Sequence, residues 1–214
     1  MQIGERDKEF RNLKKISPAT IKMINKRLEK FEIGLLEYLR QFDNEKYDLQ
    51  VYFDAINSHQ LISTKLRDIL CWKLAGKRKY AQLSKKHQSL IKRAIEKVHD
   101  INLFKKSQMS LEDFQDTLKY ISPNGPVIQL FICHICNPEK FPLFDRHVYR
   151  AFQYFKTGRI QQGSLNKKII DSYYDSYSRF FNSLHARYRR LYSRKEIDSA
   201  LMVFGKELSQ RKNS

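Results

Sequence analysis

Residues 121–150 read ISPNGPVIQLFICHICNPEKFPLFDRHVYR. The Ser-Pro-Asn-Gly-Pro turn at 122–126 separates two helical patterns, and the second, about 126–136, is apolar almost all round, which predicts a buried helix. A short apolar loop then leads to Asp145, an N-cap residue for a helix that runs to about Lys156. The stretch therefore predicts one carboxylate at a buried helix N-terminus, beside a turn whose amides can hold a phosphate.

Helical periodicity continues outward in both directions, with few Pro and Gly residues and no strand-like alternation. Further helices are predicted at about 17–42, 46–57, 59–75, 82–99, 110–121, 166–192 and 195–207. We therefore expect an all-α protein built as a two-lobed helical bundle. A flexible basic N-terminal arm at 1–16 would precede a single domain at 17–214, and lobes of about 17–105 and 106–214 are one option for its division.

The chain is strongly basic, with 41 Lys and Arg against 23 acidic residues and a formal net charge of +18. Such a charge favours nucleic acid as the partner, because a basic face releases counterions from a polyphosphate. An anionic membrane is the second option, but the sequence has neither an apolar run of about 18 residues nor a signal-peptide pattern. We expect a soluble cytoplasmic monomer with no membrane partner, nucleoid-associated if the source is prokaryotic.

The three cysteines, Cys71, Cys133 and Cys136, do not form a disulfide framework. The last two have the C-x-x-C spacing of metal sites, but no second pair exists and both lie within the apolar helix. Small buried thiols are common in protein cores. We therefore predict core packing for this pair and no metal.

The pattern around Gly125 and Asp145 resembles the helix-hairpin-helix family of DNA base-excision glycosylases, which includes endonuclease III, adenine glycosylase and 8-oxoguanine DNA glycosylase. In that family a Gly-rich hairpin binds the DNA backbone, and a catalytic aspartate follows the second hairpin helix. Here the hairpin position, 121–125, carries one of the two family glycines, and Gly125 lies 20 residues before Asp145. The aspartate motif reads Leu143-Phe144-Asp145-Arg146-His147-Val148-Tyr149-Arg150.

The resemblance implies a DNA glycosylase that flips out and hydrolytically excises a modified base, in base-excision repair or in phage defence. Asp145 would be its catalytic residue, stabilising an oxocarbenium-like sugar or activating water. Bifunctional members carry a lysine on the second hairpin helix, where this chain has Pro126 and Val127, so a monofunctional enzyme is expected. No cysteine follows Cys136, so the iron–sulfur cluster of some members is not expected, and no other cofactor is.

The sequence also suggests which residues hold double-stranded DNA containing the modified base. The candidate DNA contacts are Asn124, Gly125, Lys77, Arg78, Lys79, Arg146, His147, Arg187 and Arg190. The candidate base-pocket residues are Trp72, Gln129, His134 and Tyr149. The identity of the base is not readable from these residues.

Plainer interpretations stand beside these. Asp145 can be only an N-cap, His134 a satisfied core histidine, Trp72 a core residue, and the basic runs solvated surface. The alternative functions are a noncatalytic helix-hairpin-helix DNA-binding protein, or a helical regulatory protein that binds RNA or acidic partners.

Overall fold

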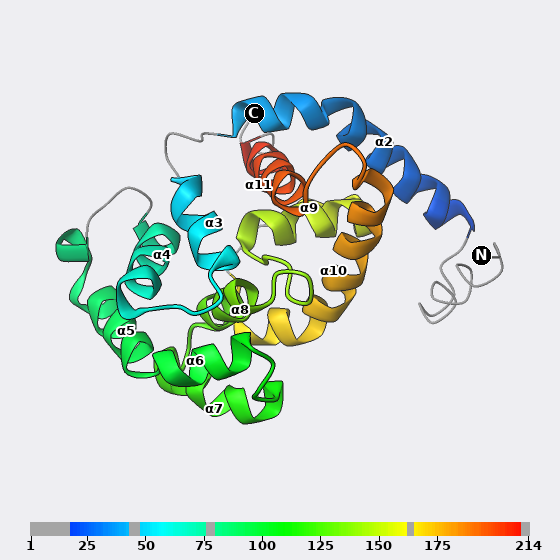
Figure 1. Ribbon diagram of the computed structural model, residues 1–214. Coiled ribbons are helices and arrows are strands. Elements are labelled where there is room, and N and C mark those ends of the chain that lie inside the picture. The colour runs from blue at the N-terminus through cyan, green and yellow to red at the C-terminus, as the bar shows by residue number, and fades with distance from the viewer. Residues whose placement is uncertain (1–17, 43–47, 76–79, 162–164, 211–214) are drawn as a thin grey trace.

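The computed structural model describes residues 18–42, 48–75, 80–161 and 165–210. Over these residues the chain is helical, with no strand, which confirms the all-α prediction (Figure 1). The predicted N-terminal arm at 1–16 and the basic residues Lys77, Arg78 and Lys79 lie outside the described residues.

The order of the elements follows the predicted one closely. The elements are α2 (Pro18–Gln41), α3 (Leu49–Asn57), α4 (Ser63–Ala75), the short 3₁₀ helix η1 (Tyr80–Gln82), α5 (Lys85–Glu96), α6 (Val98–Lys105), α7 (Leu111–Ile121), α8 (Pro126–Cys136), α9 (Arg146–Thr157), α10 (Lys167–Tyr188) and α11 (Arg194–Gln210). One prediction was wrong: the helix expected over 82–99 ends at Glu96, and the chain bends at Lys97 into α6. The apolar residues of α6 then pack into the core, which is why the helical pattern continued past the bend.

The core consists of two hydrophobic clusters. The first gathers buried residues between Tyr52 and Leu143, from α3 to α8 and the loop that follows. The second joins α2 to the chain from Phe144 onward. α2 therefore packs with α9 and α11, as Figure 1 shows, and from α3 onward the border between the two clusters lies at 143–144.

Local capping explains several of the boundaries. Ser110 accepts a hydrogen bond from the amide of Asp113 at 3.1 Å, the capping pattern expected at the start of α7. α9 ends at Gly158, whose φ of 74° is the left-handed conformation that glycine adopts without strain. The buried Asn102 side chain binds both the N–H and the C=O of Leu61, which fixes the loop before α4 against α6.

Candidate functional site

Asp145 is the N-cap of α9. Its Oδ1 accepts hydrogen bonds from the amides of His147 at 2.8 Å and Val148 at 3.0 Å. Its Oδ2 accepts none from the residues that the structure describes, and the side chain is half-buried. The carboxylate is therefore fixed through Oδ1 alone.

The loop before Asp145 is held from two sides. The ring of His134, on α8, donates from Nδ1 to the carbonyl of Phe141 at 2.7 Å. The hydroxyl of Tyr174, on α10, donates to the carbonyl of Pro142 at 3.1 Å. Side chains of α8 and α10 thus bind the backbone of this loop. These tertiary contacts, together with its own N-cap hydrogen bonds, hold Asp145 at the border of the two clusters.

Charged neighbours keep Asp145 ionised. Burial alone would raise the pKa of Asp145, but the Lys73 ammonium and the amides of Val148 and His147 outweigh it and hold the pKa below its usual value. Lys73 comes from α4 in the first cluster, and its Nζ lies 5.3 Å from the ring centroid of Phe131. No direct ion pair joins Lys73 to Asp145 among the described residues.

Replacing Lys73 with Met should therefore raise the pKa of Asp145. A carboxyl whose pKa is depressed by folding stabilises the protein above its unfolded pKa, and this contribution is lost as the pH falls through the folded value. The stability difference between wild type and Lys73→Met should thus be present at pH 7 and shrink in acid. Side-chain ¹³C NMR titration of Asp145 measures the pKa, and Lys65→Met, an exposed lysine on the same helix, is the matched control. If the pKa of Asp145 is unchanged in Lys73→Met, Lys73 does not contribute to the electrostatics of this site.

His147 and Arg150 follow Asp145 on α9 and serve mainly the packing. Burial, with Arg146 and Arg150 nearby, lowers the pKa of His147 to about 4, so it is neutral and does not attract phosphate as a cation. Its ring nitrogens face donors from Arg146 and Arg150, and a neutral imidazole accepts from one of them. The buried Arg150 donates to the carbonyl of Gly205 at 2.8 Å and ties α9 to α11. Of these side chains, Arg146 is the exposed one.

The turn between α7 and α8 lies where the sequence predicted it, but Gly125 does not have the positive φ that glycine in a turn often has. Gly125 has a φ of −116°, so the turn does not need a left-handed residue there. A Cβ at this position would overlap Oγ of Ser122, so the Ser122 side chain packs directly against the glycine. The Gly125 amide donates to the Ser122 carbonyl at 3.2 Å and is thus used inside the turn. The amides of Asn124 and Val127 have no acceptor among the described residues.

Gln129 and Arg93 hold the hairpin together. Nε2 of Gln129 donates to the carbonyl of Ser122 at 2.7 Å. The guanidinium of Arg93 donates twice to the carbonyl of Ile121, at 3.0 and 2.9 Å, and so closes the end of α7. Gln129 was predicted to line a base pocket, but its amide is engaged in the turn.

Two of the predicted pocket residues belong to one buried aromatic group. Trp72 stacks on Phe131, with ring centroids 6.1 Å apart, and packs on Tyr52. His134 accepts at Nε2 from the Tyr52 hydroxyl at 2.7 Å, and since its Nδ1 donates to a carbonyl, neither ring nitrogen is left for a base. Burial lowers the pKa of His134 to about 3. Tyr149 lies apart from this group, in the second cluster.

The remaining DNA-contact candidates lie at the end of α10. Arg187 forms an ion pair with Glu32 at 3.0 Å, and both it and Arg190 are exposed. No described contact joins either arginine to Asp145 or to the turn at 122–125.

Sequence reasoning missed three charged residues near Asp145. Lys73, on α4, helps to lower the pKa of Asp145. Lys195 and Asp198, on α11, form a buried ion pair, and burial, followed by the charge of Asp145, raises the pKa of Asp198. They occur far from Asp145 in sequence and in ordinary amphipathic helices, so no spacing pattern marks them.

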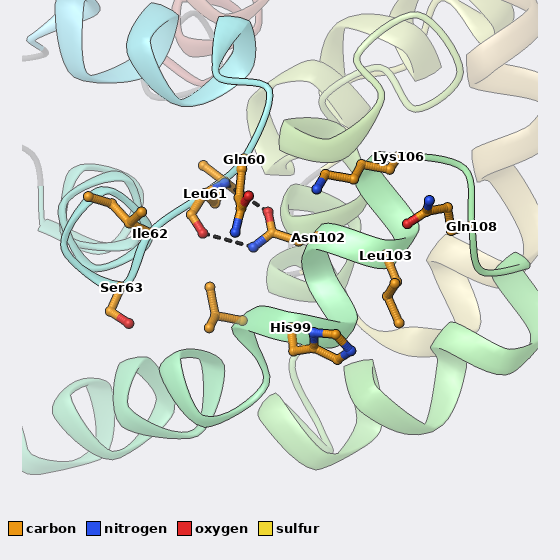
Figure 2. Close-up of a pocket in the computed structure, with 10 residues that line it drawn as sticks. Gln60, Leu61, Ile62, Ser63, His99, Asn102, Leu103, Lys106 and Gln108 are labelled. Atoms are coloured by element: carbon orange, nitrogen blue, oxygen red, sulfur yellow. Dashed lines mark hydrogen bonds between the residues drawn. The ribbon is translucent and has the colours of Figure 1, made fainter.

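A cavity of ≈ 350 Å³ lies between the loop before α4 and α6, around the Asn102–Leu61 hydrogen bonds (Figure 2). Its lining residues are Gln60, Leu61, Ile62, Ser63, Val98, His99, Asn102, Leu103, Lys106 and Gln108. None of the candidate site residues lines it, so it is separate from the Asp145 site.

Cys133 and Cys136 are free and buried, and burial raises the pKa of both thiols. The described residues contain no group of three or more His, Cys, Asp or Glu side chains able to hold a metal ion. No helix in the described part is long and apolar enough to cross a membrane. The chain matches no family model, no curated protein and no solved structure.

Proposed function

We propose that this protein is a monofunctional DNA glycosylase of the helix-hairpin-helix type, which excises a modified base by hydrolysis with Asp145 as the catalytic carboxylate. One observation carries the proposal. Asp145 is held ionised at a helix N-terminus, with Oδ1 bound by two amides and Oδ2 unengaged. A residue that acts only as an N-cap requires only Oδ1.

The chemistry suits such a carboxylate. Breaking an N-glycosidic bond leaves positive charge on the sugar, and a fixed carboxylate stabilises that charge or removes a proton from the attacking water. Because Oδ1 is already held by backbone amides, Oδ2 does not need to reorganise when charge develops. Charge stabilisation of this kind is worth most where the site is partly shielded from water, as Asp145 is.

DNA binding is supported by the charge and by the turn between α7 and α8. A net charge of +18 favours a polyphosphate partner. The amides of Asn124 and Val127, beside the N-terminus of α8, are placed to donate to a backbone phosphate. Exposed Arg146, next to Asp145, is suited to a neighbouring phosphate.

Release of free base from duplex DNA tests the proposal. Oligonucleotides carrying oxidised, alkylated or deaminated bases, and genomic DNA with hypermodified cytosine, are incubated with the protein, and free base is measured by mass spectrometry. Release of one base class supports the proposal and names the substrate. No release across the panel argues against it.

Borohydride trapping tests the monofunctional part, since α8 carries no lysine. We expect no protein–DNA adduct during base release. An adduct that disappears in Lys73→Met would make Lys73 an amine nucleophile and the enzyme bifunctional.

A second candidate, a noncatalytic DNA-binding protein with the same hairpin, is favoured by the packing of His134 and Trp72, which leaves neither free to hold a base. Such a protein would bind duplex DNA with a steep dependence on salt concentration and without preference for an abasic-site analogue. A glycosylase should prefer that analogue, because a disrupted site costs less to open.

A further inference from the structure

Two tyrosines form an aromatic wall beside Asp145. Tyr149 packs edge-on against Phe144, the residue before Asp145, with ring centroids 5.8 Å apart, and its amide donates to the Asp145 carbonyl at 2.8 Å. On its other side Tyr149 packs on Tyr173 of α10, with ring centroids 5.7 Å apart. Both tyrosine side chains are half-buried. The wall therefore runs from the N-terminus of α9 across to the neighbouring helix α10 (Figure 1).

Two cations flank this wall. Arg146 follows Asp145 directly, and Lys156, in the last turn of α9, places its Nζ 5.4 Å from the centroid of the Tyr173 ring. Both cations are exposed, and neither forms an ion pair with an acidic residue that the structure describes. Because an exposed ammonium lies over the Tyr173 ring, that face of the ring is at the protein surface and is not sealed in the core.

The combination of aromatic rings and unpaired cations fits nucleotides whose bases are not paired. An exposed ring is a face on which a base stacks, and a cation beside it binds the phosphate. The bases of a duplex are already stacked on one another, so only an unpaired or extruded base can use such a ring. Arg146 and Lys156 are ten residues apart on α9, or ~15 Å along the helix axis. A few nucleotides span that length.

We propose that this tyrosine face, made of Arg146, Tyr149 and Lys156 on α9 with Tyr173 on α10, binds a single-stranded segment of DNA. A base stacks on Tyr173 and displaces the Lys156 ammonium from the ring, and the ammonium then binds the adjacent phosphate. Tyr149 forms the wall beside this base, and Arg146 binds a phosphate at the Asp145 end. That this segment is the one presented to Asp145 rests on the proposed function, whereas binding of single-stranded DNA does not.

Binding of a labelled oligothymidylate of about 12 nucleotides tests this surface without any modified base, because sequence-independent stacking sites accept every base. Fluorescence anisotropy measures its Kd. Tyr173→Ala should raise the Kd by about 5- to 100-fold, because a stacking platform is lost. Tyr173→Phe keeps the ring and should bind within about twofold of wild type.

Tyr154→Ala is the matched control. Tyr154 is also a half-buried tyrosine of α9 with a cation over its ring, since Cζ of Arg27 lies 5.9 Å from its centroid. It packs on Phe204 of α11 and makes no described ring contact with the tyrosine face. Its Kd should stay within about twofold of wild type. Wild-type binding by Tyr173→Ala, or an equal loss in Tyr154→Ala, would overturn the proposal.

Lys156→Gln tests the phosphate contact, and as a surface substitution it carries the comparison if Tyr173→Ala does not fold. Losing one phosphate contact to a single strand should reduce the slope of log Kd against log salt concentration by about 0.7. Lys65→Gln, at an exposed lysine of α4, should leave the slope unchanged. An unchanged slope in Lys156→Gln would reject Lys156 as a phosphate ligand and with it the displacement from the ring.

Titrations with duplex DNA and with oligouridylate separate the ligands. Only the binding of single strands should depend on Tyr173, so an equal loss of duplex binding in Tyr173→Ala would overturn base stacking. Tighter binding of the RNA than of the DNA would overturn the assignment to DNA. Absence of base release together with Tyr173-dependent binding would reject the glycosylase and leave this surface standing, whereas base release without that dependence would do the reverse.

Discussion

Asp145→Asn should reduce the single-turnover rate of base release by about 10²–10³-fold or more while the protein stays folded. Asparagine caps helices as well as aspartate does, so its amide oxygen can keep the bonds to the amides of His147 and Val148. The variant loses the negative charge that the transition state requires. Rapid-quench assays on the base found in the release panel measure the rate, and circular dichroism checks the fold.

Asp145→Ala is the companion variant that separates charge from capping. Asp145→Ala loses both the negative charge and the N-cap hydrogen bonds. It should therefore be about as inactive as Asp145→Asn, and its free energy of unfolding should be lower by about 1 kcal/mol. An Asp145→Asn variant with near wild-type base release would reject Asp145 as the catalytic residue and leave it an N-cap. Tight binding to an abasic-site analogue by inactive Asp145→Asn would show that the DNA site survives the substitution.

Gly205→Ala should destabilise the protein by about 3 kcal/mol or more, which corresponds to a fall in Tm of roughly 6–12 °C. A Cβ at this position would lie 2.0 Å from the carbonyl oxygen of His147 and 2.6 Å from its carbonyl carbon. Both atoms are backbone, so relief requires α9 and α11 to move apart. That movement also pulls the Gly205 carbonyl from Arg150. Thermal and urea unfolding measure the effect.

Gly34→Ala is the control for this substitution. Its Cβ would approach only the far end of the Tyr38 ring, at 2.9 Å, which can shift. Gly34 is also inside α2, where alanine is favoured over glycine by about 1 kcal/mol. Gly34→Ala should therefore be close to neutral. If Gly205→Ala is as mild as Gly34→Ala, the contact between α9 and α11 is less tight than the structure has it.

Acid should weaken the fold through Asp145 in a defined direction. Its pKa lies below the ordinary value, so its contribution to stability is present at neutral pH and disappears as the pH falls through the folded pKa. His147 also destabilises the fold in acid. Its pKa is lowered to about 4 in the folded protein, so as the pH falls the unfolded chain binds this proton first.

Local sequence determined the helices and several of their ends. The apolar pattern of α8 predicted its burial, and Asp145 predicted the N-terminus of α9. These signals succeed because capping and amphipathic periodicity act within a few residues of one another. The same reasoning failed at Lys97, where an apolar pattern continued through a bend.

Only the tertiary structure decided what surrounds Asp145. It brought Lys73 from α4 and the Lys195–Asp198 pair from α11 to the border between the clusters, and it engaged His134 in the core. It also joined α2 to the C-terminal helices. Many helices in this chain have similar apolar faces, so the pairing of faces depends on the shape and packing of all of them together. The sequence by itself therefore determined where a carboxylate begins a helix, and the packing determined which charges surround it.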